Sequence, residues 1–211
     1  DFFTGQLGLV WKVAPNGSIY ASYATSATPP GSMLGEGAES NNLSGTPDRN
    51  GNLQDSDMKP EETTNYEIGT KWDLLNDSLS LTAAIFRTEK ENTRVAVDAD
   101  TFENAGKTRV DGIELSATGK ITDQWQVFAG YTYLDAKQKD GGPVAANSAK
   151  DGNQLPNTPK NSASVWTTYA ITPKLTIGGG AFYVDKVFGD VGNTVYVPSY
   201  TRYDAMASYK L

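Results

Sequence analysis

The sequence predicts an all-β protein, part of an antiparallel up-and-down transmembrane β-barrel. Three observations support this fold class: apolar residues recur with period two, tight and long connections alternate, and an aromatic ring lies close to each tight connection. The segment ITDQWQVFAGYTYLDA (121–136) illustrates the period. Its apolar and aromatic residues share one side of an extended chain: Trp125, Val127, Ala129, Tyr131 and Tyr133. Polar or small residues share the other side: Gln124, Gln126, Gly130 and Thr132.

The same alternation predicts a series of strands along the whole chain. They are Phe2–Ala14, Ser18–Ser26, Glu62–Leu75, Ser78–Thr93, Phe102–Lys120, Gln124–Lys137, Lys160–Ala170, Lys174–Lys186 and Val195–Leu211. No apolar pattern of helical period persists for three turns, so no helix is predicted.

The connections between these strands fall into two classes that alternate along the chain. Tight reversals are predicted at Pro15–Gly17, Asn76–Asp77, Ile121–Asp123 and Ile171–Pro173. Longer connections are predicted at 27–61, 94–101, 138–159 and 187–194. An up-and-down sheet places every second connection at the same end, so tight turns are expected at one end and long loops at the other. The longest, 27–61, is polar and rich in Gly and Pro, and is either disordered without ligand or ordered as a ligand cap.

Aromatic residues near the tight reversals predict the depth of the strands in a membrane. The predicted lipid-facing girdle consists of Trp11, Tyr20, Trp72, Trp125 and Tyr169. Amphipathic rings prefer the headgroup level of a bilayer, which a general preference of aromatics for strands does not explain. The opposite parity carries the charged residues Glu67, Lys71, Asp73 and Glu114. Such a face predicts a lumen that is wet or filled by other polar protein.

Composition excludes several classes of function. The chain has 25 acidic and 18 basic residues and a net charge of −7, which argues against a nucleic-acid partner. It contains neither cysteine nor histidine. These absences remove the commonest metal ligands and the commonest general base, so the sequence does not predict an enzyme.

Three stretches resemble one family, the TonB-dependent siderophore receptors of Gram-negative outer membranes, in particular the catecholate type. They are KPEETTNYEIGTKWDLLNDSLSLTAAIFRTEKENTR (59–94), GKTRVDGIELSATGKITDQWQVFAGYTYLDA (106–136) and LPNTPKNSASVWTTYAITPKLTIGGGAFYV (155–184). The resemblance implies a barrel of about 22 strands with an N-terminal plug inside it. Residues 1–211 resemble only the C-terminal part of that barrel, and we expect the plug and the N-terminal strands to be absent from this chain.

The resemblance also implies cargo, partners and location. We expect import of a ferric siderophore across the cell outer membrane, with the inner-membrane protein TonB acting on the plug. Outer-membrane lipid would surround the barrel, and no cofactor would be bound directly. Iron would be carried as a chelate whose hard oxygen ligands already satisfy the metal, so the protein need not ligate it.

An anionic, ring-bearing chelate calls for cations and aromatic surfaces at the loop ends of the strands. Candidate ligand-binding residues are Arg87, Arg94 and Arg109, of which Arg94 and Arg109 flank a short loop and are expected to point into the mouth. These cations could equally be solvated or contact anionic outer-leaflet lipid. Further loop-end cations are Lys90, Lys107, Lys137, Lys139 and Lys186.

Two other classes of protein stay open from the sequence. One is a stand-alone porin or adhesin barrel of about eight to ten strands. The other is a soluble carbohydrate-binding or hydrolytic β-sheet protein, in which a second sheet would cover the apolar face. The medium that meets this face therefore separates the hypotheses.

Overall fold

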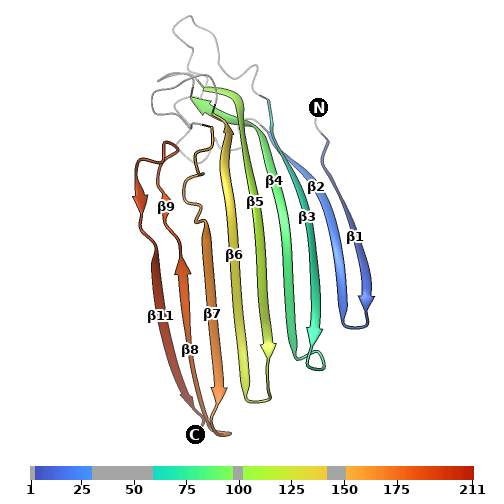
Figure 1. Ribbon diagram of the computed structural model, residues 1–211, viewed down its shortest axis with the longest axis vertical. Helices are drawn as coiled ribbons and strands as arrows, with labels where there is room; N and C mark the ends of the chain where they lie inside the picture. Colours follow the sequence, from blue (N-terminus) through green and yellow to red (C-terminus); the bar gives the residue numbers. More distant parts are fainter. Residues whose placement is uncertain (1–2, 30–58, 97–101, 142–150) are drawn as a thin grey trace, which may run out of the picture.

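The computed structural model describes residues 3–29, 59–96, 102–141 and 151–211, with 94–96 and 102–105 described by their backbone alone. Every regular element in these residues is a β-strand (Figure 1). The strands are β1 (Gly5–Ala14), β2 (Gly17–Thr28), β3 (Glu61–Leu74), β4 (Leu79–Ala96), β5 (Phe102–Lys120), β6 (Trp125–Asp140), β7 (Asn161–Ala170), β8 (Leu175–Val184), β9 (Val187–Phe188), β10 (Tyr196–Val197) and β11 (Tyr200–Tyr209).

Nine of these strands form one antiparallel sheet in the order β1-β2-β3-β4-β5-β6-β7-β8-β11. Each strand pairs with its neighbour in sequence up to β8, which is the up-and-down topology that the alternation of connections predicts. β9 and β10 form a separate two-stranded ribbon inserted between β8 and β11. The predicted all-β antiparallel fold is confirmed.

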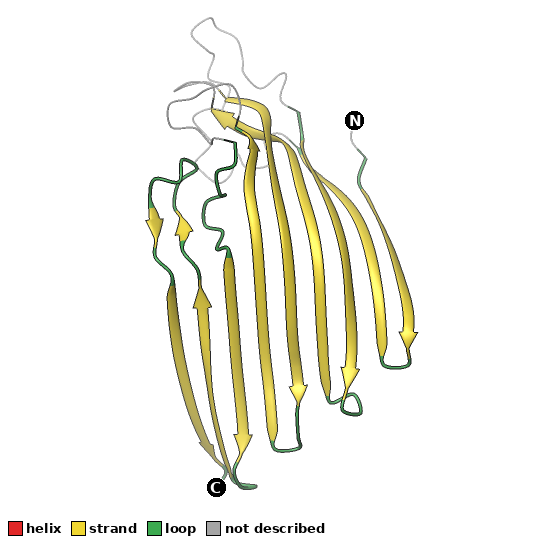
Figure 2. Ribbon diagram, in the orientation of Figure 1, coloured by secondary structure: helices red, strands yellow, loops and turns green. Residues whose placement is uncertain are grey.

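The two ends of the sheet differ as predicted. Tight connections join β1 to β2, β3 to β4, β5 to β6 and β7 to β8, and all of them lie at the lower end of the sheet in Figure 2. The longer connections leave from the opposite end, and we refer to the two as the turn end and the loop end. Much of the predicted connections 27–61, 94–101 and 138–159 lies outside the described residues, so the alternatives for 27–61 stay open.

The predicted strand 195–211 is interrupted. Tyr196 and Val197 pair with β9, and the main sheet resumes only at Tyr200. The intervening Pro198 has no backbone N–H and cannot donate to a ladder hydrogen bond, which accounts for the break. The predicted loop 187–194 correspondingly begins with β9.

The sheet has no second layer in the described part of the chain. Ala136 is the only buried apolar residue there, whereas Ile68 and Ile85 on central strands are 55% and 56% exposed. A soluble sandwich would cover such residues with a facing sheet. None of the described residues forms a helix of the length and hydropathy needed to cross a membrane.

Candidate functional site

The strand register separates the sheet into two faces of different chemistry. One face carries Ile68, Ile85, Ile113 and Tyr133, which are successive cross-strand partners, and we call it the apolar face. Tyr66, two residues before Ile68 on β3, shares this face. The other, the polar face, carries the charged residues predicted to share one side: Glu67, Lys71, Asp73 and Glu114. The alternation predicted for 124–133 is confirmed, because directly opposite residues of an antiparallel pair lie on the same face.

Four of the five predicted girdle residues lie on the apolar face close to the turn end. They are Trp11, Trp72, Trp125 and Tyr169. Trp125 pairs directly with Tyr169, and its indole Nε1–H donates a hydrogen bond of 2.7 Å to the Thr167 hydroxyl. The Tyr169 hydroxyl donates to the Gln124 side chain at 3.2 Å. Rings with an apolar body and a bonded polar edge suit a membrane interface, and contact with lipid stays a prediction.

Tyr20 does not belong to this group, so that part of the girdle prediction is wrong. It lies directly opposite Gly69 on the polar face, and its hydroxyl donates a 2.6 Å hydrogen bond to the Glu67 carboxylate. The prediction placed Tyr20 by its distance from a tight turn and ignored strand parity. Ile19 and Ala21 take the apolar face instead.

Large rings also line the polar face, which the sequence analysis did not predict. Phe86 lies over Gly112 and Trp166 over Gly180, each ring facing a glycine that is its direct cross-strand partner. A Cβ atom at Gly112 would lie 2.2 Å from the Phe86 ring. Glycine therefore lets each ring lie flat against the sheet rather than project from it. Only the register identifies these pairs.

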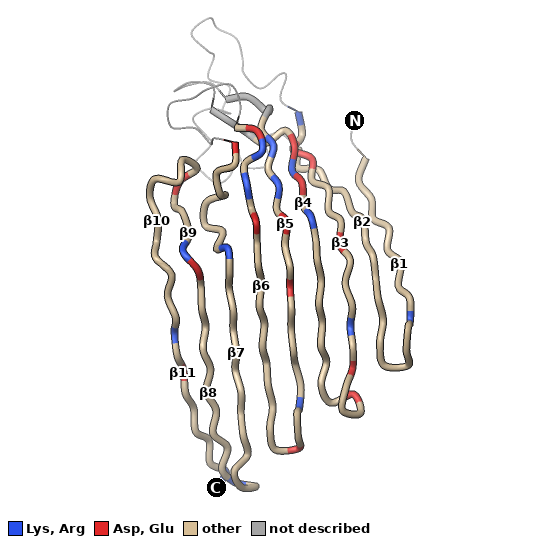
Figure 3. Tube along the Cα trace, viewed as in Figure 1, with Lys and Arg blue, Asp and Glu red and all other residues tan. Residues whose placement is uncertain are grey.

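Charged residues gather towards the loop end, as Figure 3 shows for β3 to β6. Arg87 is 2.6 Å from Asp111, and Arg109 is 3.1 Å from the same carboxylate. Both arginines lie on the apolar face. Arg87 is two residues after Ile85 and Arg109 is four residues before Ile113, so each side chain points to the same face as that isoleucine. This placement argues against Arg109 pointing into the mouth, because the polar face is the one predicted to line the lumen.

Three further candidate cations of this region are paired as well. Lys107 is 2.5 Å from Glu91, Lys137 is 2.8 Å from Asp135, and Lys90 forms an ion pair with Glu61. The side chain of Arg94 lies outside the described residues, so its predicted role stays a prediction. The role of Arg87 and Arg109 in ligand binding also stays untested, although their ion pairs on the apolar face favour a structural or lipid-contacting role.

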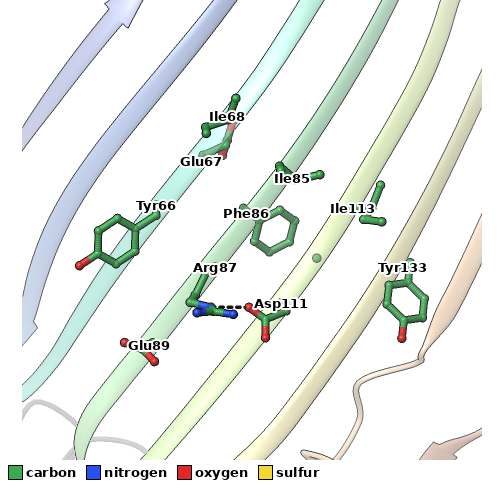
Figure 4. Close-up of a pocket in the computed structure, with 11 residues that line it drawn as sticks. Tyr66, Glu67, Ile68, Ile85, Phe86, Arg87, Glu89, Asp111, Ile113 and Tyr133 are labelled. Carbon is green, nitrogen blue, oxygen red and sulfur yellow. Dashed lines mark hydrogen bonds and ion pairs between the residues drawn. The ribbon is translucent and has the colours of Figure 1, made fainter.

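An open groove of about 750 Å³ lies on the apolar face, on the turn-end side of these charges (Figure 4). Ile68, Ile85 and Ile113 form a row across three strands, and Arg87 with Asp111 borders the groove towards the loop end. Aliphatic side chains next to a charged pair can hold an alkyl chain whose polar head lies at the pair. The groove thus suits the boundary between the interior and the headgroups of a bilayer.

The loop end beyond β6 and β8 is held by a polar network. Residues 151–155 add to β6: Gln138 N–H donates to the Asn153 carbonyl, and Leu155 N–H donates to the carbonyl of the buried Ala136. Asn193 then joins this segment to the 187–197 region. Its side-chain amide donates to the Gln154 carbonyl at 2.8 Å and accepts from the Gln154 N–H at 2.8 Å.

Asp190 closes the loop between β9 and β10. Its carboxylate accepts hydrogen bonds from the backbone N–H of Val195 at 2.8 Å and of Thr194 at 2.9 Å. The Thr194 hydroxyl donates a third bond of 2.8 Å. These donors, the Val195 N–H first, hold the pKa of Asp190 below its usual range.

No group of three or more metal-ligating side chains occurs among the residues that the structure describes. The arrangement comprises a two-faced sheet, a ring of aromatics at the turn end and a hydrogen-bonded rim at the loop end. This geometry suits a wall between lipid and a polar lumen.

Comparison with known proteins identifies the family. A family model described as TonB dependent receptor-like, beta-barrel matches residues 1–211. The chain is 53% identical over 217 residues to the probable TonB-dependent siderophore receptor PiuA of Acinetobacter baumannii, covering 100% of this chain and 28% of the relative. It is 36% identical over 211 residues to the catecholate siderophore receptor Fiu of Escherichia coli strain K12, covering 98% of this chain and 26% of the relative.

Solved structures agree. The crystal structure of the siderophore receptor PiuA from Acinetobacter baumannii superposes with a TM-score of 0.85 at 50% identity, covering 99% of this chain and 29% of that chain. The closed form of the ferric-catecholate import receptor Fiu from Escherichia coli K12 superposes with a TM-score of 0.78 at 34% identity. This match covers 99% of this chain and 28% of that chain. The chain thus spans little more than a quarter of these proteins. It belongs to the TonB-dependent receptor-like β-barrel family, whose members are receptors rather than enzymes.

Proposed function

We propose that the protein containing residues 1–211 is an outer-membrane receptor that imports ferric siderophores, driven by TonB. The 53% identity to a siderophore receptor over the whole chain is the observation that carries this proposal. The uncovered apolar face supports it, since a lipid environment is the physical alternative to a facing sheet.

Residues 1–211 would form part of the transmembrane barrel, with the apolar face toward lipid and the polar face toward the lumen. The rings of Trp11, Trp72, Trp125 and Tyr169 would mark the interface at the turn end. Strands and a plug contributed by the remainder of the protein would close and fill the barrel, and TonB would act on that plug.

The cargo would be iron already enclosed by a catecholate-type siderophore. Similarity to a catecholate siderophore receptor supports this class. The chain contains no histidine or cysteine, and a chelate that satisfies its own metal requires neither. Recognition would therefore depend on charge and ring contacts with the chelate rather than on metal coordination.

Uptake of radiolabelled iron by intact cells tests the function. Cells that carry the full-length receptor should accumulate iron from a ferric catecholate, and deletion of either the receptor or TonB should abolish that accumulation. Uptake that persists in a strain lacking the receptor, with no other catecholate receptor present, would contradict the proposal.

Spin labels on neighbouring residues test the membrane orientation independently. Tyr131 lies on the apolar face and Thr132 on the polar face of β6. In the full-length receptor in lipid, a label at Tyr131→Cys should be relaxed by oxygen, which partitions into the bilayer. A label at Thr132→Cys should be relaxed by a water-soluble reagent, and equal responses at both positions would contradict the orientation.

A further inference from the structure

The β9–β10 ribbon presents a lysine enclosed by two aromatic rings. The Lys186 Nζ lies 4.6 Å from the ring centroid of Phe188 and 5.4 Å from that of Tyr196. Phe188 and Tyr196 are direct cross-strand partners, so their rings share one face of the ribbon. We call Lys186, Phe188 and Tyr196 the Lys186 platform.

The charge of Lys186 is available in a way that the charges of Arg87, Lys107 and Lys137 are not. Arg87, Lys107 and Lys137 are each held by a carboxylate within 2.8 Å. For Lys186, the described residues place no carboxylate within salt-bridge distance, and aromatic faces hold the ammonium instead. A cation held this way keeps most of its attraction for an incoming anion.

The carboxylate of the adjacent Asp185 accepts a hydrogen bond from the Lys186 backbone N–H at 2.8 Å and does not pair with the Lys186 ammonium. The same carboxylate accepts a 2.9 Å hydrogen bond from the Asn161 side chain, and Asn161 lies on the apolar face opposite Tyr133. Lys186 lies between β8 and β9, outside both strands, and its position is given by its contacts with the Phe188 and Tyr196 rings. The polar face of the adjacent β8–β11 pair carries Arg202, whose guanidinium lies 4.6 Å from the Phe182 ring centroid.

The platform is held before any ligand arrives. The Asn157 N–H donates to the Phe188 carbonyl at 2.8 Å, and Gly189 N–H donates to the Val195 carbonyl at 2.9 Å. The Asn193–Gln154 pair and the Asp190 turn fix the connection between the two strands. Tyr196 itself remains 58% exposed, so its ring can accept a stacking partner. A rigid and accessible site loses little entropy on binding.

We propose that the Lys186 platform binds the anionic aromatic chelate, with the Lys186 ammonium contacting catecholate oxygens and the Tyr196 ring stacking on a catechol ring. This assignment rests on the proposed function. It replaces the predicted contacts at Arg87 and Arg109 with Lys186 and the two rings of the β9–β10 ribbon.

Binding of ferric tris-catecholate to the full-length receptor tests the assignment, measured by quenching of tryptophan fluorescence. Lys186→Gln and Tyr196→Leu should each weaken binding by roughly three- to tenfold. Added salt should reduce the affinity of the Lys186→Gln variant less than that of the unmodified receptor. Lys174→Gln is the matched control, because the Lys174 Nζ lies 6.0 Å from the Tyr209 ring centroid at the turn end, and it should leave binding unchanged. Equal melting temperatures would establish that all variants are folded.

A ferric trishydroxamate, which has neither aromatic rings nor a net negative charge, is the second probe. If Lys186→Gln weakens both probes equally, or weakens neither, the platform assignment is overturned. Should the unmodified receptor bind tris-catecholate tightly while both platform variants match it, only this assignment fails and the proposed import function stands. A receptor that binds no tris-catecholate but takes up iron from another chelate would overturn both the assignment and the catecholate class.

Discussion

Tight turns with unusual backbone angles join neighbouring strands at the turn end, whereas side chains add links between segments distant in sequence at the loop end. Between β3 and β4 the connection is made by Leu75, Asn76 and Asp77, which have positive φ angles of 55°, 56° and 63°. At the opposite end, ion pairs and the hydrogen bonds of the Asn193 side-chain amide link segments distant in sequence. The difference suggests that changes at the turn end disturb the fold, and that changes at the loop end disturb local structure or binding.

The largest effect is expected at Gly119, where β5 ends next to the turn after β3. Its φ of 139° is strained for any residue with a side chain, and a Cβ atom would lie 2.1 Å from the Ser78 carbonyl oxygen. Gly119→Ala should reduce the free energy of unfolding by more than about 2 kcal/mol, because backbone atoms must move. Thermal unfolding of the full-length receptor in detergent would measure this change.

Gly8→Ala provides the control for Gly119, because a Cβ atom at Gly8 meets nothing within 4 Å. The control should retain the unmodified melting temperature. If the two variants have the same melting temperature, backbone geometry at the turn end does not determine stability, and the contrast between the two ends is wrong.

A smaller and local effect is expected at Asn193. Asn193→Ala removes both hydrogen bonds to Gln154 and leaves alanine at a φ of 57°. The loss of about 1–3 kcal/mol should appear as faster amide hydrogen exchange in 151–160 and 187–197, without a comparable change in the central strands. Asn16→Ala is the matched control, because it removes a hydrogen bond from the Asn16 side-chain amide to the Asp73 carbonyl at the turn end. Exchange that rises equally in both variants would contradict a local role.

The faces of the sheet could be predicted from sequence, because side chains alternate strictly along a strand and a bilayer sorts them by polarity. Trp72 and Trp125 were placed correctly by this rule. Tyr20 was misplaced, and Arg109 was assigned to the mouth, because proximity to a turn or a loop was used instead of parity. Parity with Ile113 on the same strand places Arg109 on the apolar face, whereas Tyr20 requires the β2–β3 register.

The loop end was less predictable for a physical reason. β9 and β10 each have two residues, too few to show a period, and only Pro198 signalled the interruption. The bond between Asn193 and Gln154 joins residues 39 positions apart, and nothing local in the sequence specifies it. The Lys186 platform depends on the pairing of β9 with β10, so its lysine could be noted as a cation but not as part of a cluster.

Acid should open the loop between β9 and β10. The pKa of Asp190 is lowered in the folded state, so its carboxylate stabilises the loop above the unfolded pKa of about 4, and this contribution is lost as pH falls through the folded pKa. Pepsin should therefore cleave within 187–197 increasingly as the pH is lowered below about 4. Asp190→Asn should be cleaved at that site even at about pH 4, where the unmodified protein still resists. Identical cleavage of both proteins at every pH would contradict the role of the Asp190 carboxylate in closing the loop.

The smallest effect is expected from the ion pair between Arg87 and Asp111, although its 2.6 Å separation makes it conspicuous. The two side chains are 49% and 31% exposed, so solvent screens the pair and Arg87→Gln should leave the melting temperature almost unchanged. The variant should also bind ferric tris-catecholate as the unmodified receptor does, because Arg87 lies on the apolar face. A tenfold loss of affinity in Arg87→Gln would place the chelate on the apolar side of the rim. The division between a lipid-facing and a ligand-facing side at the loop end would then be wrong.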